Sequence, residues 1–212
     1  MIKNIVFDMG NVLIKFDRGL FLDNVGVTDP EDRAILLREI YLSLEWSMMD
    51  RGSLTDAQAA VRFEKRLPEH LKKYASLLTE HWDRPIFPVD GVADYVRELK
   101  ARGYKIWLLS NASYHQHDYW EEIPSWECFD GTMISADVKL VKPQPEIYLL
   151  LCSKFGLVPG ECVFVDDSGP NVEGAAYCGM HGIVFHGDIA ELREKLEGII
   201  AAASGTDSVE KE

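Results

Sequence analysis

Five short apolar runs, separated by longer helical patterns, most constrain the fold of this chain. Each run is rich in valine, isoleucine, leucine, phenylalanine or tryptophan, which is typical of strands buried on both faces. Helical patterns separate most of the runs, and this alternation predicts a parallel sheet covered by helices on both sides. The predicted strands span residues 5–8, 105–110, 132–135, 162–166 and 182–185.

Proline and glycine mark the ends of the predicted helices. Pro145 stands where a first helical turn would begin, while Gly103 and Gly156 each follow the last turn of a helical pattern. The sequence therefore predicts helices over residues 89–102, 145–155, 171–178 and 189–202.

Between residues 16 and 88 the pattern changes. Stretches such as "DPEDRAILLREIYLSLEW" have helical spacing of apolar residues and little strand signal. We interpret this block as a compact helical cap inserted after the first strand. The predicted organisation is a core of residues 1–15 and 89–203, a cap of residues 16–88, and a disordered polar tail of residues 204–212.

The charge of the chain argues against several classes of partner. Its 22 Lys and Arg against 35 Asp and Glu give a net charge of −13, which is unfavourable for binding nucleic acid or an anionic membrane. No apolar run is long enough to span a bilayer, and Asp8 interrupts the apolar N-terminus without a cleavage site after it. We expect a cytoplasmic protein with reduced thiols, because no CxxC pair occurs among Cys128, Cys152, Cys162 and Cys178.

Polar residues lie at the carboxyl ends of three of the predicted strands. Asp8 ends the first strand, Ser110 ends the second with Asn111 directly after it, and Asp166 ends the fourth with Asp167 directly after it. Ligands of open parallel sheets bind outside the carboxyl ends of the strands, so we expect these side chains to converge. Lys142, in the stretch "LVKPQPEIY", would reach the same place from a loop.

Such a cluster predicts phosphoryl transfer. Three carboxylates repel one another and need a cation, and all-oxygen ligation suits Mg²⁺. The cation and Lys142 would hold a phosphate, with the Ser110 hydroxyl as a neutral donor, and a carboxylate aimed at phosphorus can act as a nucleophile. Each residue alone has a simpler explanation as a turn or capping residue. The prediction rests on all four positions occurring together in this order.

The order of these stretches resembles that of the haloacid dehalogenase-like hydrolase superfamily. "VFDMGNVL", "LLSN", "VKPQPEIY" and "VFVDDSGPNVEGA" are similar to its four motifs, and the helical block lies where one class of members carries a cap. The resemblance implies an α/β fold with a Rossmann-like core. Its five parallel strands would have the order 5-4-1-2-3, with the helical cap inserted after the first strand.

The resemblance also implies roles for the clustered residues. Asp8 would be the nucleophile, and Mg²⁺ would be held by Asp8, the backbone carbonyl of Gly10 and Asp167, with Asp166 acting through water. For the phosphate, Ser110 and Asn111 would bind it and Lys142 would neutralise it and orient Asp8.

Gly10 departs from the usual pattern of these phosphatases. They usually carry a second aspartate two residues after the nucleophile, as general acid and base, and this chain has Gly10 there. The D-x-G-N-V form is similar to a branch that includes bacterial glucose-1-phosphate phosphatases. A cap residue or a bound water would then have to carry the proton, and Gly10 would let its carbonyl approach the metal.

Several functions remain open at this point. The leading prediction is a Mg²⁺-dependent phosphatase that hydrolyses a small phosphorylated metabolite, most simply a sugar phosphate, through an aspartyl-phosphate intermediate. The alternatives are a metal-independent dehalogenase of the same superfamily and a catalytically weak phosphate-binding or regulatory protein. A receiver domain also gathers acids, a hydroxyl and a lysine, but its acid pair comes first in the chain and it has no cap.

Overall fold

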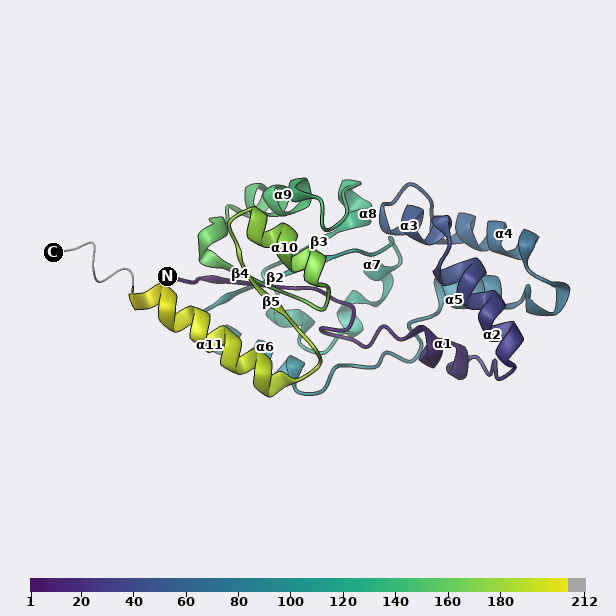
Figure 1. The fold of residues 1–212 in the computed structure, drawn as a ribbon, viewed down its shortest axis with the longest axis horizontal. Coiled ribbons are helices and arrows are strands. Elements are labelled where there is room, and N and C mark those ends of the chain that lie inside the picture. Colours follow the sequence, from purple (N-terminus) through teal and green to yellow (C-terminus); the bar gives the residue numbers. More distant parts are fainter. Residues whose placement is uncertain (206–212) are drawn as a thin grey trace.

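The computed structural model describes residues 1–205 and centres on a five-stranded parallel sheet (Figure 1). The strands lie in the order β3-β2-β1-β4-β5, so the predicted order 5-4-1-2-3 is confirmed. In the central ladder Asn4 lies opposite Lys105 on one side and Cys162 on the other. The strands are β1 (Asn4–Phe7), β2 (Lys105–Ser110), β3 (Gly131–Ile134), β4 (Cys162–Asp166) and β5 (His181–Val184).

The predicted bounds were right for β2 and β4 and one residue too late for the other three strands. Asp8, Ser135 and Phe185 were assigned to strands and instead follow them. The backbone N–H of Asp8 still donates to the carbonyl of Val165 at 2.9 Å, which anchors the residue beyond the last ladder position. Asp8 therefore stands at the carboxyl edge of the sheet, where the chain leaves it.

Successive residues of β1 pack on opposite faces of the sheet. Ile5 and Phe7 join the buried cluster that contains side chains of α6 (Val92–Ala101) and α11 (Ile189–Gly205). Val6 joins the cluster on the other face, with side chains of α9 (Pro145–Phe155) and α10 (Gly169–Tyr177). The two helix pairs thus cover the two faces, as the apolar strands require (Figure 1).

Three helix bounds differ from the predicted ones. Helix α6 begins at Val92 because Gly91, just before it, adopts a positive φ of 77°. Helix α10 begins two residues earlier than predicted, at Gly169, with Pro170 in its first turn. Helix α11 continues through Ser204 and Gly205, so the tail predicted from residue 204 was placed too early. The rest of that tail lies outside the described residues.

The remaining core elements are short and connect the strands to the larger helices. They are α7 (Gln116–Tyr119), α8 (Ser135–Val138) and 3₁₀ turns at Trp120–Glu122, Trp126–Cys128 and Pro159–Glu161.

Residues 16–88 form a group of helices at one end of the sheet, with a buried core of their own (Figure 1). We call residues 16–88 the helical segment. Thr55 and Gln58 form a capping box at the start of α4, which explains the sharp boundary there. The elements are α1 (Arg18–Asn24), α2 (Pro30–Leu36), a π-helical turn (Leu37–Tyr41), α3 (Leu44–Asp50), α4 (Asp56–Arg66), a 3₁₀ turn (Glu69–Leu71) and α5 (Tyr74–Glu80).

The two ends of the helical segment lie side by side. Lys15 N–H donates to the carbonyl of Phe87 at 2.7 Å, Val89 N–H donates to Leu13 at 3.0 Å, and Ile14 and Pro88 form an antiparallel bridge. We call this paired stretch the neck.

Within residues 1–205, no helix combines the length and the apolar character needed to cross a bilayer.

Candidate active site

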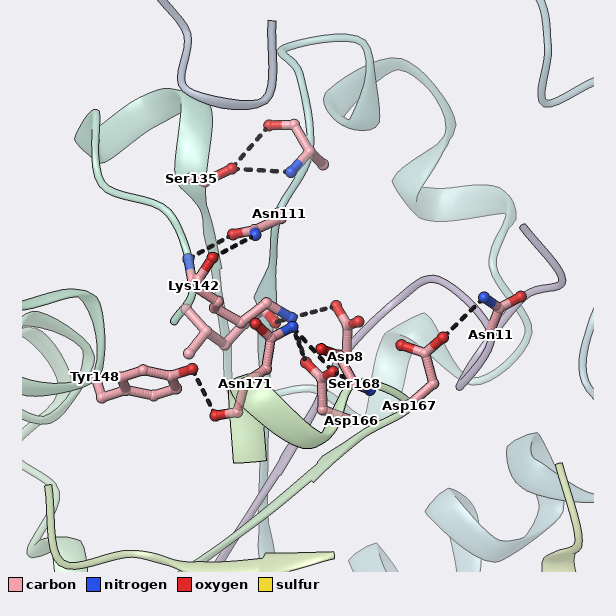
Figure 2. Close-up of polar contacts among 12 residues, drawn as sticks. Asp8, Asn11, Asn111, Ser135, Lys142, Tyr148, Asp166, Asp167, Ser168 and Asn171 are labelled. Carbon is pink, nitrogen blue, oxygen red and sulfur yellow. Dashed lines mark hydrogen bonds and ion pairs between the residues drawn. The ribbon is translucent and has the colours of Figure 1, made fainter. Parts of the chain in front are cut away.

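A buried lysine bridges two carboxylates at the carboxyl edge of the sheet (Figure 2). Lys142 Nζ lies 2.7 Å from Asp8 Oδ1 and 2.6 Å from Asp166 Oδ2. The side chains of Lys142 and Asp166 have no exposed surface, and that of Asp8 is 11% exposed. The structure therefore brings together three of the residues that the sequence predicted to converge.

Asn111 holds the backbone of Lys142 in place. Its Nδ2 donates to the Lys142 carbonyl at 3.0 Å, and its Oδ1 accepts from the Lys142 N–H at 2.8 Å (Figure 2). The lysine ammonium also donates to the carbonyl of Leu109 at 3.0 Å. Because both polar ends of the Asn111 side chain are engaged in this way, a contact to phosphate would fall to its backbone. The predicted role of Asn111 as a phosphate ligand stays a prediction.

Because Lys142 is shared by two carboxylates, it only partly stabilises the ionised form of Asp8. Burial raises the pKa of Asp8 to about 7; Lys142 opposes this rise and the Asp166 charge adds to it. For Lys142, burial alone would lower the pKa, but the two carboxylates outweigh burial and hold it above its ordinary value. The ammonium therefore remains charged and the site still has excess negative charge.

The two acids of the Asp166–Asp167 pair have different environments. Asp166 accepts hydrogen bonds from Ser168 N–H and from Asn171 Nδ2 in addition to the Lys142 ion pair, so both of its oxygens are engaged. Asp167 is exposed, and its Oδ2 accepts from Asn11 Nδ2 at 2.9 Å (Figure 2). Asp167 thus keeps an oxygen free for a ligand, whereas both oxygens of Asp166 are occupied by contacts within the protein.

The donor set fits a divalent cation. Oxygens of Asp8, Asp166 and Asp167 lie within 4.8 Å of one another. Three carboxylates and one ammonium sum to −3 + 1 = −2, which a divalent ion would balance. Hard oxygen ligands are those that Mg²⁺ prefers. Asp8 and Asp167 are the carboxylates of this cluster with an oxygen available to the cation, and the water-mediated role of Asp166 stays a prediction.

Gly10, whose carbonyl is predicted to approach the metal, has an ordinary backbone conformation. Gly10 is outside the left-handed region, and a Cβ there would meet the Phe16 side chain at 3.5 Å, an ordinary contact. The backbone therefore does not require glycine, and the carbonyl–metal contact stays a prediction. The neighbouring Asn11 adopts a positive φ of 55°, which asparagine tolerates, while its Oδ1 accepts from Phe16 N–H.

A cavity of about 340 Å³ lies over this cluster, between the strand ends and the helical segment. Ser110 lines it, and among the described residues the Ser110 hydroxyl has no hydrogen-bond partner, so it is available to a ligand. The opposite wall comes from the helical segment and combines aromatic with charged side chains. These are Phe16, Arg18, Tyr41, Trp46, Asp50, Asp56 and Trp82.

The sequence did not reveal which residues of the helical segment face the site. Arg18 and Asp50, a basic and an acidic residue, both line the cavity, and neither makes an ion pair within the described part of the chain. Burial and the neighbouring charge of Asp56 raise the pKa of Asp50 to about 7, with Arg18 acting in the opposite direction. A raised pKa beside a reactive cluster is typical of a functional residue.

Substituting Asp50 by asparagine should change the pH dependence of stability. Between the ordinary pKa of 3.8 and about 7, the folded protein holds a proton that the unfolded chain releases, so Asp50 destabilises the fold increasingly as pH rises through this window. The stability of Asp50→Asn relative to wild type should therefore grow by about 1–3 kcal/mol from pH 5 to pH 8. Urea unfolding in metal-free buffer measures it. A difference that stays constant with pH would show that Asp50 is ionised throughout.

Comparison with known proteins identifies the family. The family model of the haloacid dehalogenase-like hydrolases matches residues 2–179. This chain belongs to the haloacid dehalogenase-like hydrolase family. The resemblance predicted from the four motifs is thereby confirmed, whereas membership of the narrower D-x-G-N-V branch stays a prediction.

Relatives of this hydrolase differ widely in length. The D-ribitol-5-phosphate phosphatase of Bacteroides thetaiotaomicron is 26% identical over 192 residues, or 81% of this chain and 86% of that protein. The mouse bifunctional epoxide hydrolase 2 is 32% identical over 101 residues, which are 45% of this chain and only 18% of the longer protein. For mouse acyl-CoA dehydrogenase family member 10 the identity is 28% over 145 residues, 65% of this chain and 13% of that protein.

A solved structure shares the fold of this hydrolase over most of its length. A haloacid dehalogenase family enzyme from Bacteroides thetaiotaomicron, in complex with magnesium and inorganic phosphate, has a TM-score of 0.69. It is 23% identical, and the match covers 91% of this chain and 99% of that one. This likeness confirms the α/β fold.

Proposed function

We propose that this hydrolase is a Mg²⁺-dependent phosphatase acting on a small phosphorylated metabolite, with sugar phosphates as the preferred class. The main support for the proposal is that Lys142 lies between Asp8 and Asp166, with the exposed Asp167 in the same cluster of carboxylates. This arrangement combines a nucleophilic carboxylate, a buried cation beside it and a second acid free to bind a metal.

The chemistry follows from the positions of these groups. Asp8 attacks phosphorus and forms an aspartyl phosphate, which water then hydrolyses. Lys142 holds the attacking carboxylate and, together with the Ser110 hydroxyl, donates to the phosphate oxygens. Asp8, Asp167 and the Gly10 carbonyl would hold a Mg²⁺, which would supply the positive charge that the anionic substrate requires.

The size and lining of the cavity support a small polyhydroxylated substrate. A volume of about 340 Å³ suits a phosphorylated metabolite, and aromatic walls with a few charged groups suit a ring carrying hydroxyls. The names of the relatives agree with this class, since one acts on ribitol 5-phosphate. The net charge of −13 disfavours nucleic acid and anionic membranes as partners.

We further propose that the helical segment is a cap over the site and that the protein works in the cytoplasm. The cap would exclude bulk water and restrict substrates to small molecules, with the neck as its hinge. The neck and the separate buried core of the segment support a division between a cap of residues 16–88 and a core of residues 1–15 and 89 onwards, which was predicted to end at residue 203. A reducing compartment is consistent with four free cysteines.

The proposal is tested by phosphate release from a panel of phosphorylated metabolites, with Mg²⁺ and with a chelator. Rapid release from sugar phosphates, abolished by chelation, is the expected result. Full activity towards haloacids in chelator would favour the metal-independent dehalogenase instead. Phosphate binding without turnover on any compound would favour the regulatory alternative.

Asp167→Asn should raise the Mg²⁺ requirement selectively. Loss of a group that only supports a metal ligand typically costs about 10–100-fold, so loss of a direct carboxylate ligand should raise the Mg²⁺ concentration for half-maximal activity by about 100-fold or more. Activity is measured against Mg²⁺ concentration. The control is Asp94→Asn, an exposed acid on α6, which should behave as wild type. Equal Mg²⁺ requirements in all three proteins would remove Asp167 from the ligand set.

A further inference from the structure

Gly10 leaves the proposed reaction without a proton donor next to the nucleophile. When the bond from phosphorus to the leaving oxygen breaks, that oxygen must gain a proton unless it departs as a stable anion. A donor must then lie elsewhere on the wall of the cavity that holds Asp8. The titratable residues on that wall are Asp8, Arg18, Tyr41, Asp50, Asp56, Tyr119 and Asp167.

Most of these residues are unsuited to moving a proton near neutral pH. Arginine stays protonated, and burial raises the pKa of Tyr41 and Tyr119 far above the neutral range. Burial raises the pKa of Asp56, but its Oδ1 accepts a hydrogen bond from Ser113 Oγ at 2.5 Å, which favours the ionised form. With Asp8 and Asp167 assigned to attack and metal binding, Asp50 is the remaining acid whose two oxygens accept no hydrogen bond from the described residues.

The backbone around Asp50 is fixed to the core, although the residue belongs to the helical segment. Ser135 Oγ donates to the Asp50 carbonyl at 2.5 Å, and Lys139 Nζ donates to the carbonyl of Gly52 at 2.5 Å. A Cβ at Gly52 would lie 2.2 Å from the carbonyl oxygen of Ala136, so the turn after α3 packs directly on α8. These contacts hold Asp50 at the junction of the segment with the strand ends.

The carboxylate of Asp50 faces charged groups from both sides of the cavity. Asp56 of α4 and Arg18 of α1 act on it from the helical segment, and Asp8 and Lys142 act on it from the core. No described residue donates a hydrogen bond to its side chain, so its oxygens are open to a ligand. Asp50 is therefore electrostatically linked to the nucleophile and unoccupied by protein contacts.

We propose that Asp50 is the residue that donates a proton to the leaving oxygen and later takes one from the attacking water. This inference rests on the proposed phosphatase function. In the first step the Asp8 carboxylate forms a bond to phosphorus, the bond to the leaving oxygen breaks, and the Asp50 proton moves to that oxygen. In the second step water attacks phospho-Asp8, its proton returns to Asp50, and phosphate and the free Asp8 carboxylate are released.

The test measures how strongly turnover depends on the leaving group. Wild type and Asp50→Asn are compared on 4-nitrophenyl, phenyl and benzyl phosphate with saturating Mg²⁺. The variant should lose about 10²–10⁴-fold in kcat/KM on benzyl phosphate, whose alkoxide needs a proton, and less than about tenfold on 4-nitrophenyl phosphate. On 4-nitrophenyl phosphate it should also release a rapid burst of nitrophenol, because water attack on phospho-Asp8 lacks its base.

Two matched variants separate proton transfer from positioning. Asp50→Glu should recover part of the benzyl phosphate activity, and Asp56→Asn should leave the ratio between benzyl and 4-nitrophenyl phosphate as in wild type. A uniform loss on all three esters in Asp50→Asn, or the selective loss in Asp56→Asn instead, would overturn the inference. Failure of the wild type to cleave any ester would instead reject the phosphatase function itself.

Discussion

Replacing Asp8 by asparagine is expected to lower phosphatase turnover by about 10⁴-fold or more. The amide is a poor nucleophile, and the substitution also removes one of the two carboxylates with an oxygen free for a metal. The fold should survive, because burial already raises the pKa of Asp8 to about 7 and a neutral side chain suits this site. Phosphate release with Mg²⁺ and a thermal unfolding curve measure the two effects.

Asp94→Asn serves again as the comparison for Asp8→Asn. It removes a carboxylate from an exposed position on α6, and its turnover should equal that of wild type. Turnover of Asp8→Asn within about tenfold of wild type would exclude Asp8 as the nucleophile, because general electrostatic effects alone account for losses of that size.

Lys142→Met should destabilise the protein more than any other single substitution at the site. Methionine preserves the bulk of the side chain but removes the ammonium, which leaves two buried carboxylates without their cation. Breaking a buried ion pair in this way typically costs about 3–5 kcal/mol, and we expect a loss in that range at pH 8. Urea unfolding of the metal-free proteins measures the difference.

The loss in Lys142→Met should become smaller in acid. Burial raises the pKa of Asp8 to about 7, so protonation of Asp8 removes one of the two charges that the lysine balances, and the difference in free energy of unfolding between wild type and variant should narrow from pH 8 to pH 5. Lys195→Met, which removes an exposed lysine paired with Glu191, should change stability by less than about 0.5 kcal/mol at either pH. A loss below about 1 kcal/mol in Lys142→Met would mean that the ammonium is not needed to stabilise the buried carboxylates.

The positions of the core residues could be predicted because they depend on strand topology. Asp8, Ser110 and Asp166 each stand at the end of an apolar run, and parallel pairing brings these ends to one edge. The prediction failed on finer contacts that join distant parts of the chain. Nothing in the sequence near Asn111 shows that its amide would bind the backbone of Lys142, which lies 31 residues away.

The contribution of the helical segment could not be predicted for a related reason. Helical periodicity shows which side of a helix is apolar, but not how a group of helices is oriented on another domain. That orientation depends on tertiary contacts such as the close approach of Gly52 to Ala136. In the sequence Asp50 and Arg18 look like ordinary surface residues of short helices, but in the structure both line the cavity.

The neck makes the helical segment a module that can be exchanged. The backbone at its two ends is joined by hydrogen bonds in the neck. The 73 residues of the segment (16–88) therefore form one closed loop inserted into the core. The entropy of closing a loop grows only with the logarithm of its length, so doubling this insertion would cost only about 0.6 kcal/mol more. The chain can therefore tolerate a longer or shorter segment at this position at little cost in stability, while the sheet and its lysine–carboxylate cluster remain unchanged.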